Sequence, residues 1–173
     1  MSIGWAHALI AIVIGQRLAE LAYSRRNARA LIARGGKETG AGHYPLFIVL
    51  HAAWLAALTA FTEPSPSPRW GLLIVLGVLL GLRVWILASL GPYWTTRIIT
   101  VDGGKLVTTG PYRYLRHPNY MIVAFEMPVL SMALDLPWVA LAFGLANGAL
   151  LLYRISMENA ALERAGRSAA ASG

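Results

Sequence analysis

The stretch WGLLIVLGVLLGLRVWILASL, residues 70–90, decides the fold of this protein. Arg83 is its one charged residue, and every other position is apolar, glycine or serine. A helix of about 20 such residues crosses the ~30 Å hydrocarbon core of a lipid bilayer. The stretch therefore predicts a transmembrane helix.

Further apolar segments lie on both sides of this stretch, and glycine- or proline-rich turns separate them. The expected segments are Ile3–Ala22, Pro45–Phe61, Trp70–Leu90, Asn119–Leu134 and Pro137–Tyr153. We therefore expect an all-α integral membrane protein with about five transmembrane helices. Residues 1–173 are expected to form a single membrane domain, with three helices in residues 1–90 and the remainder in residues 91–165.

The composition supports a membrane protein. Of 173 residues, 57% are hydrophobic and only 13% are charged, whereas soluble domains carry roughly 25% charged residues. A soluble globular protein and a disordered chain are both excluded, because each needs more charge or less hydrophobicity. The chain has no cysteine, which excludes disulfides and thiolate chemistry.

The net charge is +7, and the basic residues are distributed among the loops as expected for a membrane protein. The loops after the first and third segments, together with the C-terminal tail, hold most of the basic residues: Arg25, Arg26, Arg29, Arg34, Lys37, Arg97, Lys105, Arg113, Arg116, Arg154, Arg164 and Arg167. The opposite loops hold only Arg69. The positive-inside rule then predicts an outward N-terminus and a cytoplasmic C-terminus. No nucleic-acid motif accompanies the charge, so we expect no nucleic-acid partner.

Several ionisable residues lie within the predicted helices, where charge is costly and often functional. Arg17 and Glu20 are three residues apart and are expected to pair with each other near the end of their helix. His51 is either a packing residue or a functional one. Arg83 and Glu126 form either a buried pair or part of a substrate pocket.

The connection from Gly91 to Pro118 combines glycines, tyrosines and arginines. Such a loop suits a nucleotide-like cofactor at the membrane surface, but it also suits an interfacial anchor. Arg154 and Glu158 are four residues apart on the helix after the fifth segment, a spacing that usually gives a solvated salt bridge. The residues alone leave these alternatives open.

Two sequence blocks carry a resemblance to a known family. The block LVTTGPYRYLRHPNY, residues 106–120, is followed by RISMENAAL, residues 154–162. The pair resembles the signature of the isoprenylcysteine carboxyl methyltransferase family, whose members are integral membrane enzymes that use S-adenosylmethionine. The resemblance covers about Trp94 to Leu162.

The resemblance implies a cytoplasmic cofactor pocket between the loop before the fourth helix and the C-terminal helix. Arg154 would face the methyl acceptor. Arg97 falls at a family cofactor contact, but its residue type differs. The other residues implied to bind S-adenosylmethionine, released as S-adenosylhomocysteine, are Gly104, Lys105, Leu106, Val107, Tyr112, His117, Pro118, Asn119, Tyr120 and Glu158.

Residues 17–47, RLAELAYSRRNARALIARGGKETGAGHYPLF, are similar to a bacterial branch of the family found beside type III polyketide synthases. Members of that branch O-methylate alkylresorcinols or alkylpyrones. Met121-Ile122-Val123 stands where prenylcysteine enzymes usually have a glycine, which argues against an isoprenylcysteine carboxylate acceptor. We expect an O-methyltransferase of the bacterial inner membrane that acts on a lipophilic small molecule among membrane lipids, with no obligate protein partner.

A phenolic or enolic acceptor must lose a proton before methyl transfer, because an unperturbed phenol titrates near about 10. Arg154 or Arg83 would lower the pKa of that hydroxyl, and His51 or Glu126 would accept its proton. We expect no metal. Two alternatives are an NADPH-dependent membrane lipid or sterol reductase and a small transporter or binding subunit with Glu126 as its coupling carboxylate.

Overall fold

A computed structural model describes residues 4–39, 42, 44–101, 107–115 and 117–171. Its elements are α1 (Trp5–Ala33), β1 (Lys37–Thr39), α2 (Tyr44–Phe61), α3 (Trp70–Leu90), the 3-10 turn η2 (Gly91–Tyr93), β2 (Ile98–Thr100), the 3-10 turn η3 (Gly110–Arg113), α4 (Pro118–Ala133) and α5 (Pro137–Ala171). All five expected segments form helices. The protein is an all-α membrane protein.

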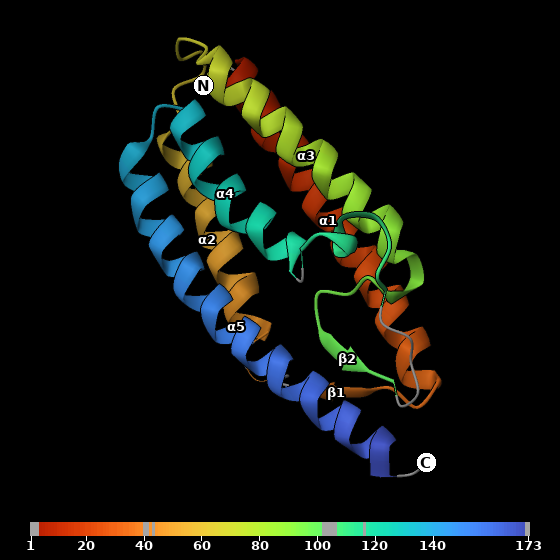
Figure 1. The fold of residues 1–173 in the computed structure, drawn as a ribbon. Helices are drawn as coiled ribbons and strands as arrows, with labels where there is room; N and C mark the ends of the chain where they lie inside the picture. Colours follow the sequence, from red (N-terminus) through yellow and green to blue (C-terminus); the bar gives the residue numbers. More distant parts are fainter. Residues whose placement is uncertain (1–3, 40–41, 43, 102–106, 116, 172–173) are drawn as a thin grey trace.

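Four helical spans are long and apolar enough to cross a membrane: Trp5–Ala33, Tyr44–Phe61, Trp70–Tyr93 and Pro137–Ala160. The fourth expected segment forms α4, which has 16 residues and a length of about 24 Å. It packs against α3 and α5. Figure 1 shows that α4 lies in the bundle with the other helices.

The first helix is longer than predicted, because α1 continues past Ala22 to Ala33. The fifth segment and the C-terminal helix expected after it form one continuous helix, α5, which ends at Ala171. Hydropathy marks the part of a helix that suits lipid, whereas the backbone stays helical until a residue breaks it. Gly35, with φ of 85°, follows the end of α1, and its backbone N–H donates to the Ile32 carbonyl.

The connections alternate between two ends of the bundle (Figure 1). The start of α1 and the α2–α3 and α4–α5 connections lie at one end, while β1, β2 and the end of α5 lie at the other. Most of the basic residues are therefore carried by segments at the β1–β2 end.

A small antiparallel sheet at that end was not predicted. Its register pairs Lys37 with Thr100 and Thr39 with Ile98. Strands of three residues are too short to show a hydrophobic period. This sheet ties the connection after α1 to the connection after α3.

Side chains of α1 fix the segment that follows α3. The Asn27 amide donates to the carbonyls of Gly91, at 3.1 Å, and Trp94, at 2.9 Å. The backbone N–H of Thr96 donates to the Ser24 hydroxyl at 2.8 Å. Residues 91–97 are thereby held against the extended part of α1.

Gly110 fixes where η3 meets α3. Its φ is 60°, and a Cβ atom there would lie 2.2 Å from Oγ of Ser89. Only glycine combines this backbone conformation with so close an approach. The contact positions η3 and hence Tyr112 beside the bundle.

Candidate active site

One large cavity, of about 760 Å³, lies between α1, α2, α4, α5 and the segment around β2. Both apolar and charged side chains line it. Ten residues that were predicted from the sequence are among them: His51, Arg83, Arg97, Val107, Tyr112, His117, Asn119, Tyr120, Arg154 and Glu158.

The remaining predicted residues lie elsewhere or outside the described part of the chain. Pro118 is buried at the first turn of α4. Glu126 is fully buried and contacts the cavity wall through its ion pairs. Gly104, Lys105 and Leu106 fall outside the described residues.

The Tyr120 hydroxyl connects Arg154 and Glu158, the two site residues that were predicted on the C-terminal helix. The Tyr120 hydroxyl donates to Oε2 of Glu158, and Nε of Arg154 donates to the same hydroxyl at 2.8 Å. Tyr120 of α4 therefore mediates the contact between Arg154 and Glu158, in place of the solvated salt bridge that their spacing alone usually gives. Arg154 is only 8% exposed.

Aromatic faces surround the Arg154 guanidinium. Its Cζ lies 5.4 Å from the centroid of Phe47 and 5.5 Å from that of Tyr120. Such cation–π contacts hold a cation in a desolvated site without neutralising its charge. Arg154 therefore remains a positive centre within the cavity wall.

His117 extends this group of side chains. Its ring stacks on Tyr120 at 5.4 Å, and Nε2 lies 3.2 Å from the side-chain oxygen of Asn159. Because that amide oxygen can only accept, Nε2 is the donor. The Asn159 contact thus fixes the proton on one nitrogen of His117.

Tyr112 of η3 faces the same end of the cavity. Burial raises the pKa of Tyr112 to about 12, and the nearby Glu158 carboxylate acts in the same direction. The phenol is therefore neutral at physiological pH and keeps its proton as a hydrogen-bond donor.

Arg97 is bound at the rim of the cavity. Its guanidinium lies 3.0 Å from the Glu38 carboxylate and 5.2 Å from the centroid of the Tyr44 ring. Glu38 belongs to β1 and Arg97 immediately precedes β2. The ion pair therefore joins the two strand segments through their side chains.

Arg17, Glu20, Arg83 and Glu126, called here the buried ionic quartet, connect α1, α3 and α4. Arg83 holds Glu20 through two nitrogens, with its Nη2 at 2.6 Å from Oε2, and its Nη1 lies 3.4 Å from Glu126. Arg17 contacts Glu20 at 3.1 Å and also pairs with Glu126. Two arginines and two glutamates balance to zero net charge.

The quartet confirms the predicted Arg17–Glu20 pair but corrects its environment, and it contains the buried Arg83–Glu126 pair that was one of two alternatives. Arg17 and Glu20 were expected near the end of the first helix, whereas α1 extends to Ala33 and Glu20 is only 7% exposed. Glu20 is therefore a buried partner of Arg83. Sequence spacing within one helix gives no information on a partner in another helix.

His51 lines the cavity on α2. Its Nδ1 lies 2.9 Å from the Phe47 carbonyl oxygen, and its ring meets Trp54 edge-on at 6.3 Å. A carbonyl can only accept a hydrogen bond, so Nδ1 carries the proton. Nε2 has no hydrogen-bond partner among the residues that the structure describes.

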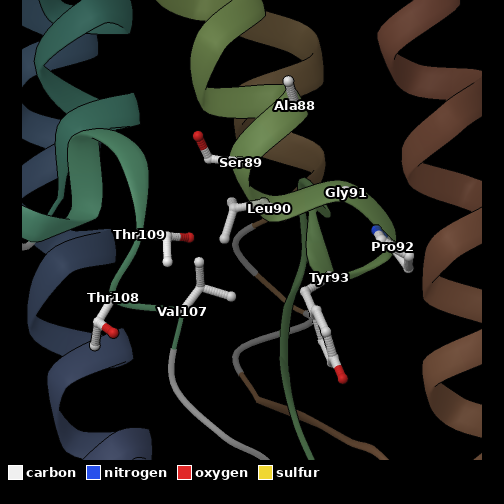
Figure 2. Close-up of a pocket in the computed structure, with 9 residues that line it drawn as sticks. All are labelled: Ala88, Ser89, Leu90, Gly91, Pro92, Tyr93, Val107, Thr108 and Thr109. Carbon is white, nitrogen blue, oxygen red and sulfur yellow. The ribbon is translucent and has the colours of Figure 1, made fainter.

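A second, smaller cavity of about 400 Å³ lies at the end of α3. Figure 2 shows the side chains of Leu90, Val107 and Thr109 between the end of α3 and the segment 107–109. Both cavities share Leu90, Tyr93, Val107 and Thr108 as lining residues. The two cavities are therefore adjacent.

Sequence reasoning missed the contributions of α2 to this site. Phe47 supplies both a ring face for Arg154 and a carbonyl for His51. An apolar residue within an apolar segment gives no signal of such a role. Glu38, the partner of Arg97, was missed because the short sheet that positions it was not predicted.

The fold and this cavity define a helical membrane protein with a charged site built inside its bundle. Residues 71–164 match the model of the isoprenylcysteine carboxyl methyltransferase (ICMT) family. The chain belongs to this family, which makes it a membrane methyltransferase by class.

Two relatives span nearly the whole chain. An uncharacterized protein of Bacillus subtilis (strain 168), YpbQ, is 37% identical over 159 residues, which cover 90% of this chain and 95% of YpbQ. An uncharacterized protein of Haemophilus influenzae (strain ATCC 51907 / DSM 11121 / KW20 / Rd) is 27% identical over 158 residues, with 88% and 91% covered. No solved structure matches the chain with significance.

Proposed function

We propose that this protein transfers a methyl group from S-adenosylmethionine to an oxygen of a lipophilic acceptor in the membrane. The observation that carries the proposal is one cavity with both polar and apolar walls. Glu158, Tyr120 and His117 line it and contact one another, and apolar side chains such as Leu55 and Leu151 line it as well. A polar cofactor and a lipid need these two environments together.

The residues present fit S-adenosylmethionine. A carboxylate such as Glu158 suits its positive charge or its hydroxyls, and the neutral phenol of Tyr112 can donate a hydrogen bond. Oδ1 of Asn119, in the cavity wall, is buried without a hydrogen-bond partner among the described residues, and so suits a donor of the ligand. When bound, the sulfonium supplies an electrophilic methyl group.

The tasks of the protein in this reaction are alignment and electrostatic stabilisation. Arg154 would face the acceptor and stabilise negative charge on its oxygen. Tyr120 would keep Arg154 and Glu158 at a fixed separation, because its hydroxyl bonds to both. Arg83 is less suited to this role, since Glu20 and Glu126 already neutralise its charge.

The acceptor would reach the site from the bilayer. Leu18 of α1 and Ile48 of α2 both line the cavity, and the two residues are 62% and 42% exposed. Exposed apolar residues in the cavity wall suit the hydrocarbon chain of such an acceptor. Alkylresorcinols, alkylpyrones and isoprenylcysteines all have such a chain.

We further propose that the β1–β2 end of the bundle faces the cytoplasm of a bacterial cell, with the protein in the inner membrane. The concentration of basic residues at that end supports this orientation. S-adenosylmethionine would then be taken from the cytoplasm.

Calorimetric binding of S-adenosylhomocysteine to the detergent-purified protein tests the function. We expect the wild-type protein to bind it and Glu158→Ala to bind it at least about 10-fold more weakly, the loss expected for a hydrogen bond to a charged group. Ser67→Ala, in the exposed α2–α3 connection, is the control and should bind normally. NADPH is the parallel ligand.

Binding of NADPH alone would replace this proposal with a lipid reductase. Absence of binding of both ligands by folded protein would favour a transporter or binding subunit. Normal binding of S-adenosylhomocysteine by Glu158→Ala would remove Glu158 from the cofactor site.

A further inference from the structure

Three arginines, called here the arginine face, cover one exposed side of α1 near its C-terminal end. Arg25, Arg26 and Arg29 are all exposed, and their spacings of three and four residues place them together on the helix surface. Figure 1 shows that α1 continues beyond the end of α3 toward the β1–β2 end. Another side of α1 is occupied there, because Ser24 and Asn27 bind the segment that follows α3. The arginine face therefore belongs to the outer surface of the protein.

The arginine face has no carboxylate partner among the residues that the structure describes. Glu20 is the one acidic residue of α1, and it is buried in the ionic quartet, where Arg17 and Arg83 bind it. Glu38 of the neighbouring strand β1 pairs with Arg97. The face thus keeps three positive charges, which suit an anion from outside the chain.

The same side of α1 is apolar on the membrane side of these arginines. Ala22 is exposed three and four residues before Arg25 and Arg26, and Leu18, one further turn away, is 62% exposed. At 1.5 Å per residue, Leu18 and Arg29 lie about 16 Å apart along the helix. The exposed surface therefore changes from apolar to basic within about one turn. A membrane lipid changes from acyl chain to headgroup in the same way.

We infer that this surface of α1 binds an anionic phospholipid, with the phosphate on the arginine face and an acyl chain along Ala22 and Leu18. A guanidinium group binds phosphate oxygens through two parallel hydrogen bonds, and basic residues at the membrane surface attract anionic lipids. Leu18 also lines the large cavity, so the bound lipid borders that cavity. The inference does not depend on the proposed methyl transfer.

A fluorescent label at one position tests the inference, because the chain has no cysteine of its own. Ala22→Cys carries a bimane label next to the arginine face, in protein reconstituted into phosphatidylcholine vesicles. Phosphatidylglycerol or phosphatidylcholine with a brominated acyl chain is included at equal mole fraction, and each quenches the label according to its occupancy beside it. The ratio of the two quenching constants measures the preference for the anionic headgroup.

Three variants are compared in this labelled protein. The first replaces all three residues of the arginine face with glutamine, and the second replaces them with lysine. Lysine keeps the positive charge, and with it the topological signal of this segment. The third, Arg113→Gln, is the control, because Arg113 is exposed at the same end of the protein but belongs to η3.

We expect phosphatidylglycerol to be preferred at least about 5-fold over phosphatidylcholine, the factor that one basic residue at an anionic membrane surface contributes. The preference should be lost with glutamine, persist with lysine and be unchanged in Arg113→Gln. Equal quenching by the two lipids in the labelled wild-type chain would overturn the inference. A preference that survives glutamine, or that lysine abolishes, would also overturn it, because charge on this face would then not be its cause.

A competition experiment distinguishes the lipid from a soluble phosphate. Glycerol 3-phosphate carries a phosphate group but no acyl chain, so it lacks the part that would lie along Ala22 and Leu18. We expect it to leave quenching by brominated phosphatidylglycerol unchanged. Displacement of the lipid by an equal concentration of glycerol 3-phosphate would show a site for a soluble anion and would refute a lipid site.

Discussion

Arg154 is a buried side chain whose charge is held by aromatic rings and a hydroxyl instead of by a direct ion pair. Ring faces and a hydroxyl surround its guanidinium, whereas Arg83 is bound by two carboxylates. Arg154 has no direct carboxylate partner among the described residues and reaches Glu158 only through the Tyr120 hydroxyl, and such a desolvated cation interacts strongly with an anion that forms nearby. This difference makes Arg154 the stronger candidate for stabilising an acceptor oxygen.

Replacing Arg154 with Ala should reduce kcat by about 100-fold, the typical effect of removing one transition-state donor. The affinity for S-adenosylhomocysteine should change by less than about 3-fold, an effect below 1 kcal/mol. Steady-state kinetics and calorimetry on the same preparation measure both quantities. Arg154→Lys keeps the charge but loses the planar group that stacks on Phe47 and Tyr120, so its kcat should fall between the two. A wild-type rate in Arg154→Ala would place the acceptor elsewhere.

The sequence indicated candidate residues of the site, but it did not indicate which of their side chains contact one another. The blocks at 106–120 and 154–162 identified Tyr120 and Glu158, because their residue types and order resemble a family pattern. The hydroxyl bridge between Arg154 and Glu158 depends on how α4 packs on α5, and spacing along one helix contains no information on that packing.

At the scale of whole elements, the buried ionic quartet fastens three helices to one another. α1, α3 and α4 each contribute at least one charge, and the carboxylate of Glu126 is fully buried between Arg17 and Arg83. In a bilayer such charges are tolerated when they are paired with each other. The quartet thus links α1, α3 and α4 inside the bundle.

Glu126→Gln should lower the free energy of unfolding by about 3–5 kcal/mol, because two buried arginines then share Glu20 alone and one positive charge is uncompensated. Unfolding of the purified protein in mixed micelles of increasing denaturing detergent would measure this loss. Glu63→Gln, at an exposed position after α2, should change the stability by no more than about 0.5 kcal/mol. Equal stability of both variants would show that the quartet does not hold the helices.

Hydropathy predicted the five helices because each apolar run is long and holds few charged residues. It could not predict that α1 continues past Ala22 to Ala33, since helical backbone there depends on the absence of breakers and not on hydrophobicity. The sheet of β1 and β2 escaped prediction for a related reason: it is stabilised by its connections to α1 and by the Arg97–Glu38 ion pair.

For the molecule as a whole, charge asymmetry between the two ends predicts orientation. The chain has no cysteine, so single cysteines can be introduced at exposed positions at either end. In intact cells, a membrane-impermeant maleimide should label Ser67→Cys, in the α2–α3 connection, but not Ala33→Cys, at the end of α1. Ala33→Cys should react only after the cells are opened, and the reverse pattern would contradict the orientation.

The exposed positions of Leu18 and Ile48 beside the cavity have a consequence for how the concentrations of the two reactants are expressed. In the proposed reaction, one reactant would dissolve in water and the other in the plane of the bilayer, so the two would arrive from different phases and would not compete for one entrance. Saturation by the acceptor is then governed by its mole fraction among the surrounding lipids. Adding more bilayer at a constant amount of acceptor dilutes that reactant alone, although the volume of the solution is unchanged.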